Sequence, residues 1–368
     1  MKLSKLSTES LSQSDIPDCS PDAAVVSRET VIPFGTTPAI NAPEATLAVQ
    51  RLLQQAEQQL NLSYDRYQTN QYEVALEAAR AAYTTYLELS HVQGQSKALG
   101  YVGLIFYSLK HYSKAIEHCQ RALALAGQVQ DLRGAVKILS TMGNAYRHLK
   151  DADRAIEYQL QSLRLAKEVN DRHSEMAALN NLGLAYKAAG EYESAIRYEE
   201  QSLEIARALN EQHLEEQILK NLGNASYSLG NYAKAIAYYE QRLALAEELG
   251  DCRLKIQILR SLGNAYYASG DYSRSIACGK QRLNLCQQLQ DLRGVEQSLG
   301  GIAIAYDSIG NYVEAIEYYQ QRLAVALQLQ DWRIEEQVIG SLKVAYYALG
   351  DYLKAAEFAN HRRNSLPS

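Results

Sequence analysis

The amino-acid sequence predicts an all-α protein built from repeated pairs of helices. Three observations lead to this prediction: a 40-residue period along most of the chain, a stretch without proline over residues 44–366, and a mixed apolar and charged composition. Of the 368 residues, 47% are hydrophobic, and the formal net charge is −5. This apolar fraction suffices for a large buried core, and a chain without proline can be helical throughout.

The beginning of the chain differs in composition from the remainder. Five of the six prolines lie within the first 43 residues, which are rich in Ser, Thr, Pro and Asp and have no amphipathic period. Such a composition is typical of a flexible segment. The sequence therefore predicts a disordered leader over residues 1–45, a repeat array over residues 46–365 and a tail over residues 366–368. No apolar run is long enough to span a membrane, and no secretory signal is visible.

Single residue types recur every 40 residues along the array. Glycine recurs from Gly103 to Gly263, and because a glycine inside a helix costs about 1 kcal/mol relative to alanine, we expect another helix backbone close to it. Ala152 fills the one gap in the tyrosine series, whose seven intervals predict eight units. The recurring tyrosines are Tyr72, Tyr112, Tyr192, Tyr232, Tyr272, Tyr312 and Tyr352.

Each unit is expected to hold two helices joined by a tight turn. In one copy, Leu259, Leu262 and Tyr266 form a helical stripe. Gly270 then stands where a left-handed C-cap belongs, and Asp271 can cap the next helix. In the second helices an arginine recurs within a Gln-Arg-Leu triplet, and we expect it to have a structural role, bonding either the neighbouring unit or a helix end. These arginines are Arg242, Arg282 and Arg322.

The spacing Leu-Gly-x-x-Tyr, then Gly-x-Tyr, then a small residue and Ile, resembles the tetratricopeptide repeat (TPR). In one unit the matching residues are Leu262, Gly263, Tyr266, Gly270, Tyr272, Ser275 and Ile276. The 40-residue length is similar to the repeats of LGN/Pins spindle-orientation scaffolds, and similar arrays occur in bacterial, particularly cyanobacterial, proteins. The resemblance implies a right-handed superhelical solenoid of about eight helix-turn-helix repeats, with the first helix of each pair lining a concave groove.

The resemblance also implies which side chains face this groove. In units two to six these positions carry Lys, Arg, Asn and Tyr, and no carboxylate opposes the cations at the same offsets. The predicted partner-binding residues are Lys97, Tyr107, Lys137, Asn144, Arg147, Asn180, Lys187, Lys220, Asn224, Tyr227, Arg260, Asn264 and Tyr267. We expect the acidic excess on the convex side, carried by second-helix residues such as Glu191, Glu193, Glu199, Glu200 and Glu204.

Two of these pairs, Lys220/Asn224 and Arg260/Asn264, resemble part of the carboxylate clamp of chaperone-binding family members. The next unit has Gly300 and Ile304 at the same offsets, so the clamp does not continue. Asn can hold the backbone of an extended peptide, and Lys and Arg can pair with carboxylates. Exposed cations on a helix can also be no more than a solvated surface.

From these features we predict a non-enzymatic protein–protein interaction scaffold, or adaptor, that binds an extended acidic peptide segment of a partner in its groove. Two alternatives remain open: an assembly factor for a photosynthetic membrane complex, and a peptide-sensing regulator. An acidic protein with a pI near 5.9 is not expected to bind nucleic acid. The terminal helix, from Tyr352 to about Arg363, lacks a polar capping helix, so we expect a partner or self-association to shield it.

Motifs for catalysis, cofactors and metals do not emerge from the sequence. It contains no GxGxxG, GxxxxGK[ST], GxSxG or HExxH motif, so we expect no enzyme and no cofactor. His111 and His118 share a helical face but lack further ligands, and we expect no metal site there. The five cysteines fit packing roles in a reducing compartment, which favours a cytoplasmic location.

Overall fold

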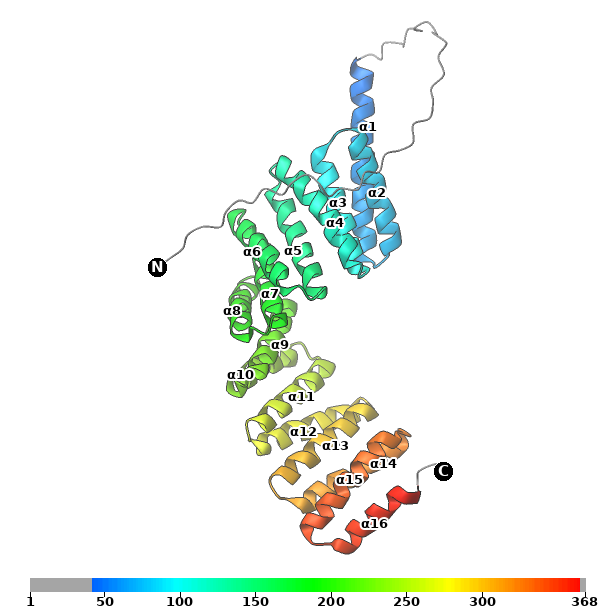
Figure 1. Cartoon of the computed structure of the whole chain (residues 1–368), viewed down its shortest axis with the longest axis vertical. Coiled ribbons are helices and arrows are strands. Elements are labelled where there is room, and N and C mark those ends of the chain that lie inside the picture. The colour runs from blue at the N-terminus through cyan, green and yellow to red at the C-terminus, as the bar shows by residue number, and fades with distance from the viewer. Residues whose placement is uncertain (1–41, 365–368) are drawn as a thin grey trace, which may run out of the picture. The chain divides into compact units, whose positions relative to one another are not determined.

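The computed structural model describes residues 42–364 (Figure 1). Within this range the chain forms sixteen helices and no strand. The helices are α1 (Ala42–Gln68), α2 (Tyr72–Glu88), α3 (Val92–Ser108), α4 (Tyr112–Gln128), α5 (Leu132–His148), α6 (Ala152–Glu168), α7 (Arg172–Ala188), α8 (Tyr192–Ala208), α9 (Gln212–Ser228), α10 (Tyr232–Glu248), α11 (Cys252–Ala268), α12 (Tyr272–Gln288), α13 (Leu292–Ser308), α14 (Tyr312–Gln328), α15 (Trp332–Leu349) and α16 (Tyr352–Asn364). The all-α prediction is confirmed.

Of the two predicted boundaries, the one between residues 45 and 46 lies within α1, and the one between residues 365 and 366 lies outside the described residues. Residues 1–41 of the predicted leader and the tail at 366–368 lie outside the described residues. The first helix starts at Ala42, within the segment predicted as leader. Among the described residues, none of the helices is both long and apolar enough to cross a membrane.

The turns between helices repeat one geometry. Each contains a residue in the left-handed region, such as Gly270 with φ +83° or Asn210 with φ +57°. At the next helix start, Asp271 accepts a hydrogen bond from the backbone N–H of Arg274 at 3.0 Å. These contacts confirm the predicted glycine C-cap and aspartate N-cap, which satisfy backbone groups that the helix ends leave unpaired.

Helix contacts in the array are between sequence neighbours. Every helix from α2 onward packs on the next one along the chain, and the first helices of several successive units also touch: α3 with α5, α5 with α7, α7 with α9, and α11 with α13. The odd-numbered helices α3 to α9 therefore lie side by side, as do α11 and α13, and we call the odd-numbered helices the row. Units one to eight are the successive helix pairs from α1–α2 to α15–α16. Since each unit contacts mainly its neighbours, this is the packing of an α-helical solenoid.

The recurring glycine of the first helices faces a side chain of the second helix. A Cβ at Gly223 would lie 2.3 Å from Cε1 of Tyr239, and one at Gly183 would lie 2.3 Å from Cγ of Glu199. The prediction of a nearby helix backbone is confirmed at Gly103, where a Cβ would lie 3.2 Å from the backbone oxygen of Ala115. At Gly183 and Gly223 the nearest atoms belong to side chains instead. What the glycine accommodates is the side chain sixteen residues later, on the second helix of the same unit.

Candidate functional site in the row of odd-numbered helices

The predicted partner-binding residues all lie on the odd-numbered helices from α3 to α11, and all are exposed or partly exposed. Two of them contact other residues of the neighbouring unit. Tyr107 and His148, from α3 and α5, lie 3.2 Å apart at Oη and Nε2, and Nδ2 of Asn221 donates to Oδ1 of Asn180 at 3.3 Å. Polar side chains of the row therefore meet between units at α3 and α5 and at α7 and α9.

Its cations are not neutralised by the chain. Lys97, Lys137, Arg147, Lys187, Lys220 and Arg260 form no ion pair with any carboxylate among residues 42–364. Basic residues elsewhere do form such pairs, for example Arg154 with Asp151 and Arg207 with Glu215, both at 2.7 Å. The positive charge of the row is thus left available to an acidic ligand.

Two asparagines of the row are held in a fixed orientation by the second helices. Oη of Tyr239 donates to Oδ1 of Asn224 at 2.7 Å, and Nε2 of Gln159 donates to Oδ1 of Asn144 at 3.2 Å. Because the amide oxygen is used in this way, the amide N–H groups of both asparagines remain as donors. They can bind a backbone carbonyl or a carboxylate.

The side chain that lies across the glycine differs from unit to unit. We call these positions slot residues: Cys119, Gln159, Glu199, Tyr239, Gly279 and Tyr319, each sixteen residues after the residue it faces. In five of the units a side chain fills the space between the two helices. In the sixth unit Gly279 leaves this space open, since a Cβ at Gly263 would meet nothing closer than 3.8 Å.

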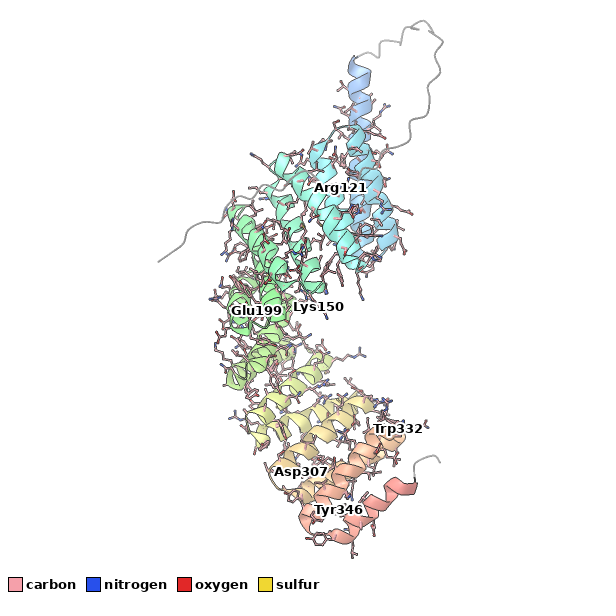
Figure 2. The ribbon with its side chains drawn as sticks, in the orientation of Figure 1. Arg121, Lys150, Glu199, Asp307, Trp332 and Tyr346 are labelled. Atoms are coloured by element: carbon pink, nitrogen blue, oxygen red, sulfur yellow. The ribbon has the colours of Figure 1, made fainter. Side chains whose placement is uncertain are left out.

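Glu199 departs from the prediction of an acidic convex surface. Its side chain, labelled in Figure 2, is fully buried, and neither carboxyl oxygen has a hydrogen-bond partner among the described residues. In units three and five the slot residue contacts Asn144 or Asn224. The equivalent residue in unit four is Leu184, so Glu199 has no amide side chain there to bind. Burial raises the pKa of the Glu199 carboxyl to about 8, with Lys187 acting in the opposite direction. The group is therefore mainly protonated at neutral pH.

The recurring arginines of the second helices are buried, and two of them are paired. Nε of Arg242 donates to Oε1 of Glu216 at 2.7 Å, and Nε of Arg322 donates to Oε1 of Glu296 at 2.7 Å. In both pairs the glutamate lies in the first helix of the same unit, 26 residues earlier. Arg322 also makes the predicted contact with the neighbouring unit, since its Nη2 donates to Oε1 of Gln337 at 3.3 Å, whereas the glutamates of both pairs belong to the arginines' own units.

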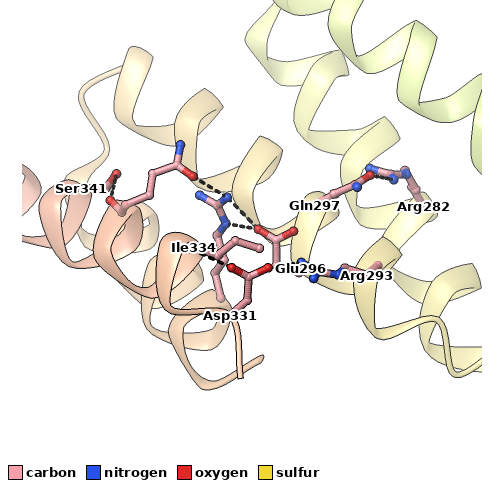
Figure 3. A network of polar contacts seen from close by, with 9 residues as sticks. Arg282, Arg293, Glu296, Gln297, Asp331, Ile334 and Ser341 are labelled. Atoms are coloured by element: carbon pink, nitrogen blue, oxygen red, sulfur yellow. Dashed lines mark hydrogen bonds and ion pairs between the residues drawn. The ribbon is translucent and has the colours of Figure 1, made fainter. Parts of the chain in front are cut away.

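Arg282 is the exception, because Ile256 stands where a glutamate would be. Its Nη2 donates to Oε1 of Gln297 at 2.8 Å, as Figure 3 shows, while its buried Nε has no acceptor among the described residues. Arg282 therefore contacts the neighbouring unit, as predicted, but it forms no ion pair with a carboxylate among residues 42–364. Glu216, Ile256 and Glu296 lie 40 residues apart, so the sequence alone could have shown that unit six lacks the glutamate.

A pocket of about 390 Å³ lies where the slot is open, bounded mainly by α11, α12 and α13. Glycines at 263, 279, 300 and 301 make room for it, and Arg282 lies in its wall. The predicted groove residues Arg260, Asn264 and Tyr267 also line it. The structure thus joins the end of the predicted groove to a cavity that the sequence did not indicate.

The cysteines and histidines give no other site. Cys119 and Cys286 are buried as predicted, whereas Cys252 is exposed, so a packing role for that residue was wrong. His118 stacks on Phe106 with the ring centroids 5.3 Å apart. Within the described part of the chain, no three His, Cys, Asp or Glu side chains are grouped as metal ligands.

Similar solved structures support the fold. The chain aligns with a signal-transduction ATPase with numerous domains and a TPR sensor from Pyrococcus horikoshii, at 19% identity and a TM-score of 0.60. The alignment covers 83% of this chain but only 46% of that protein. The apo form of RapI matches at 18% identity and a TM-score of 0.52, covering 75% of this chain and 98% of RapI.

A third structure, aspartyl phosphate phosphatase F from Bacillus subtilis, matches at 16% identity and a TM-score of 0.51, covering 77% of this chain and 73% of that one. At these identities the likeness concerns the fold alone. A comparison with curated proteins gives no match. The closer similarity to LGN/Pins repeats stays a prediction.

Family profiles extend over more than half of the chain. Three profiles described as tetratricopeptide repeat match residues 60–129, 135–208, 214–288 and 298–331. They agree with the repeat period, the glycine and aspartate caps and the helix-pair packing. The chain belongs to the tetratricopeptide repeat family.

Proposed function

We propose that this protein is a non-catalytic scaffold that binds an extended, acidic segment of a partner protein along its odd-numbered helices. One observation carries the proposal: six lysines and arginines gather on this row and none of them has a carboxylate partner among the described residues, whereas some basic residues outside the row, such as Arg207, form ion pairs. A ligand that brings its own carboxylates would complete these pairs.

The asparagines add a second type of contact. Asn144 and Asn224 keep free amide N–H groups because their oxygens are bound by Gln159 and Tyr239. These donors suit the carbonyl oxygens of an extended backbone, which recur along any peptide. Lysine and arginine would then select acidic side chains, and the amides would hold the chain in place.

A peptide array tests this proposal, with each Asp- or Glu-containing sequence paired with its Asn or Gln counterpart. We expect the wild-type protein to prefer the acidic members, and the preference to weaken as salt is raised. The double variant Lys137→Glu with Lys220→Glu should lose that preference. Equal retention of acidic and neutral peptides by the wild-type protein would contradict the proposal.

A matched control separates the row from net charge. Lys114→Glu with Arg164→Glu changes the charge equally but acts on the even-numbered helices α4 and α6. We expect this control to keep the acidic preference, because its side chains lie outside the row. If both double variants lose the preference to the same extent, overall charge rather than the row is responsible.

Two further experiments address the remaining predictions. Mass spectrometry of copurifying material distinguishes a stoichiometric protein partner, expected for a scaffold or an assembly factor, from a short peptide, expected for a peptide-sensing regulator. Self-association through the terminal unit stays a prediction. Trp332, Tyr347 and Leu353 are exposed there, and sedimentation velocity of the protein at several concentrations checks it.

A further inference from the structure

The pocket at unit six exists because one slot residue lacks a side chain. In unit five the ring of Tyr239 lies across Gly223, where a Cβ would approach it to 2.3 Å. In unit six Gly279 replaces the tyrosine, and a Cβ at Gly263 would meet nothing closer than 3.8 Å. The missing ring leaves space of the size of a side chain beside the groove.

The wall of this space holds a buried cation that lacks a carboxylate partner. Arg282 is 8% exposed, its Nε has no acceptor among the described residues, and its Nη2 donates to the neutral Gln297. Glu296 also lines the pocket, but Arg322 binds its Oε1 at 2.7 Å. With Arg260 nearby, the pocket lining carries three arginines against one glutamate. An anion entering the pocket would therefore meet a net positive charge.

The other polar groups at the pocket are suited to the same ligand. Asn264 and Gln297 contribute amides, and the oxygen of Gln297 already accepts from Arg282, which leaves its N–H groups as donors. Burial is the main effect that lowers the pKa of Arg282, and the neighbouring Arg260 acts in the same direction. A carboxylate beside Arg282 would offset both effects, because it is an acceptor-only group of opposite charge.

We propose that this pocket is the anchor subsite of the groove and takes one carboxylate-bearing residue of the partner segment. The carboxylate binds Arg282 and Arg260, as Glu216 binds Arg242 within unit five, and the stem of the residue occupies the space left by Gly279. The carboxylate comes from an Asp or Glu side chain or from a peptide C-terminus. This inference rests on the proposed function, since it specifies one position of the same groove.

The direct test follows the Arg Nε–H signals in ¹H–¹⁵N spectra while short peptides are added. Three probes separate the carboxylate sources: acetyl-Ala-Ala-Glu-Ala-Ala-amide, its Gln counterpart, and acetyl-pentaalanine with a free C-terminal carboxylate. The Arg282 signal is assigned by its loss in Arg282→Gln. We expect this signal to shift with at least one carboxylate probe, which identifies the source, and we expect the Gln probe to bind about tenfold more weakly.

A second variant tests the space without removing the arginine. Gly279→Tyr with Ile302→Ala fills the slot with the ring that Tyr239 supplies in unit five. The alanine is needed because a Cβ at Gly279 would lie 2.6 Å from Cγ1 of Ile302, and alanine has no γ carbon. We expect carboxylate binding to fall about tenfold in this variant. Arg164→Gln, which removes an exposed cation on α6, should leave binding unchanged.

The outcomes separate this inference from the proposed function. If Lys137→Glu with Lys220→Glu abolishes the acidic preference on the peptide array but the filled-slot variant binds carboxylate probes as the wild type does, the groove is supported and the anchor subsite is wrong. The anchor subsite is also overturned if neither carboxylate probe moves the Arg282 signal, or if the Gln probe shifts it as much as the carboxylate probes do. If the peptide array shows no acidic preference but the carboxylate probes move Arg282, the pocket binds carboxylates and the groove proposal fails.

Discussion

Units five and six have the same backbone plan but different interiors. Each consists of two 17-residue helices joined by the same type of turn. In unit five Tyr239 fills the slot and Arg242 is paired with Glu216, whereas in unit six Gly279 opens the slot and Arg282 has no glutamate. Two replacements between repeats thus convert a closed, ion-paired interior into a cationic pocket, while the helix lengths and the glycine turn between the two helices stay the same.

The largest effect is expected from opening the slot of unit five. Tyr239→Gly removes a buried ring and its bond to Asn224, and we expect it to lower the free energy of unfolding by about 4 kcal/mol. Urea denaturation measures this change. A loss below about 1 kcal/mol would mean that the helices close over the space, and that the opening in unit six is not fixed by its sequence.

The buried ion pair gives the next largest difference. Glu216→Gln leaves Arg242 buried without a carboxylate, which should destabilise the protein by about 3 kcal/mol. Arg282→Gln in unit six breaks no ion pair, so we expect a loss below about 1 kcal/mol. Parallel denaturation curves compare the two variants, and equal losses would contradict the difference between the units.

The buried Glu199 in the slot of unit four should make the stability of the protein depend on pH. The native state keeps the Glu199 proton up to about pH 8, whereas the unfolded chain releases it near the ordinary glutamate pKa of 4.5. Between these values the native state binds more protons, so stability should fall as pH rises, by roughly 1–3 kcal/mol between pH 5 and pH 8.

Glu199→Gln should remove this loss, because glutamine has no proton to release and Gln159 already occupies the same slot in unit three. Melting temperatures of both proteins from pH 5 to pH 8 measure the effect. Parallel pH profiles would show that Glu199 is not the group responsible.

The smallest change in stability is expected when unit six receives the missing partner. Ile256→Glu places a carboxylate where Glu216 and Glu296 stand in the neighbouring units, and a buried ion pair in place of an apolar side chain is often near neutral, within about 1 kcal/mol. The new glutamate should compete for Arg282, so the carboxylate probes should bind more weakly. If the Ile256→Glu variant binds the carboxylate probes as tightly as the wild type does, the carboxylate of the probe does not bind Arg282.

Much of the candidate site followed from the repeat period together with the resemblance to the tetratricopeptide repeat, which implied the positions that face the groove. The period placed Lys137, Asn224 and Arg260 on the same row of helices because each helix has the same length and the same turn, so equal offsets in the sequence give equal positions in space. The side chains around Glu199 and Arg282 were harder to foresee, since their surroundings combine residues of two helices. Leu184 leaves Glu199 without an amide partner, and Ile256 leaves Arg282 without a carboxylate. Neither residue by itself indicates a functional site in the sequence.

The sequence by itself determined the number of units, their helix pairs, their caps and the row that presents the cations. These depend on local propensity and on a pattern that repeats along the chain. Only the tertiary structure decided which carboxyl is buried, which arginine lacks a partner and where a pocket opens. Those properties depend on side chains 16 and 26 residues apart in the sequence, which meet only when the helices pack. The absence of a single side chain, such as the tyrosine ring or the glutamate missing from unit six, is enough to change the packing at such a contact.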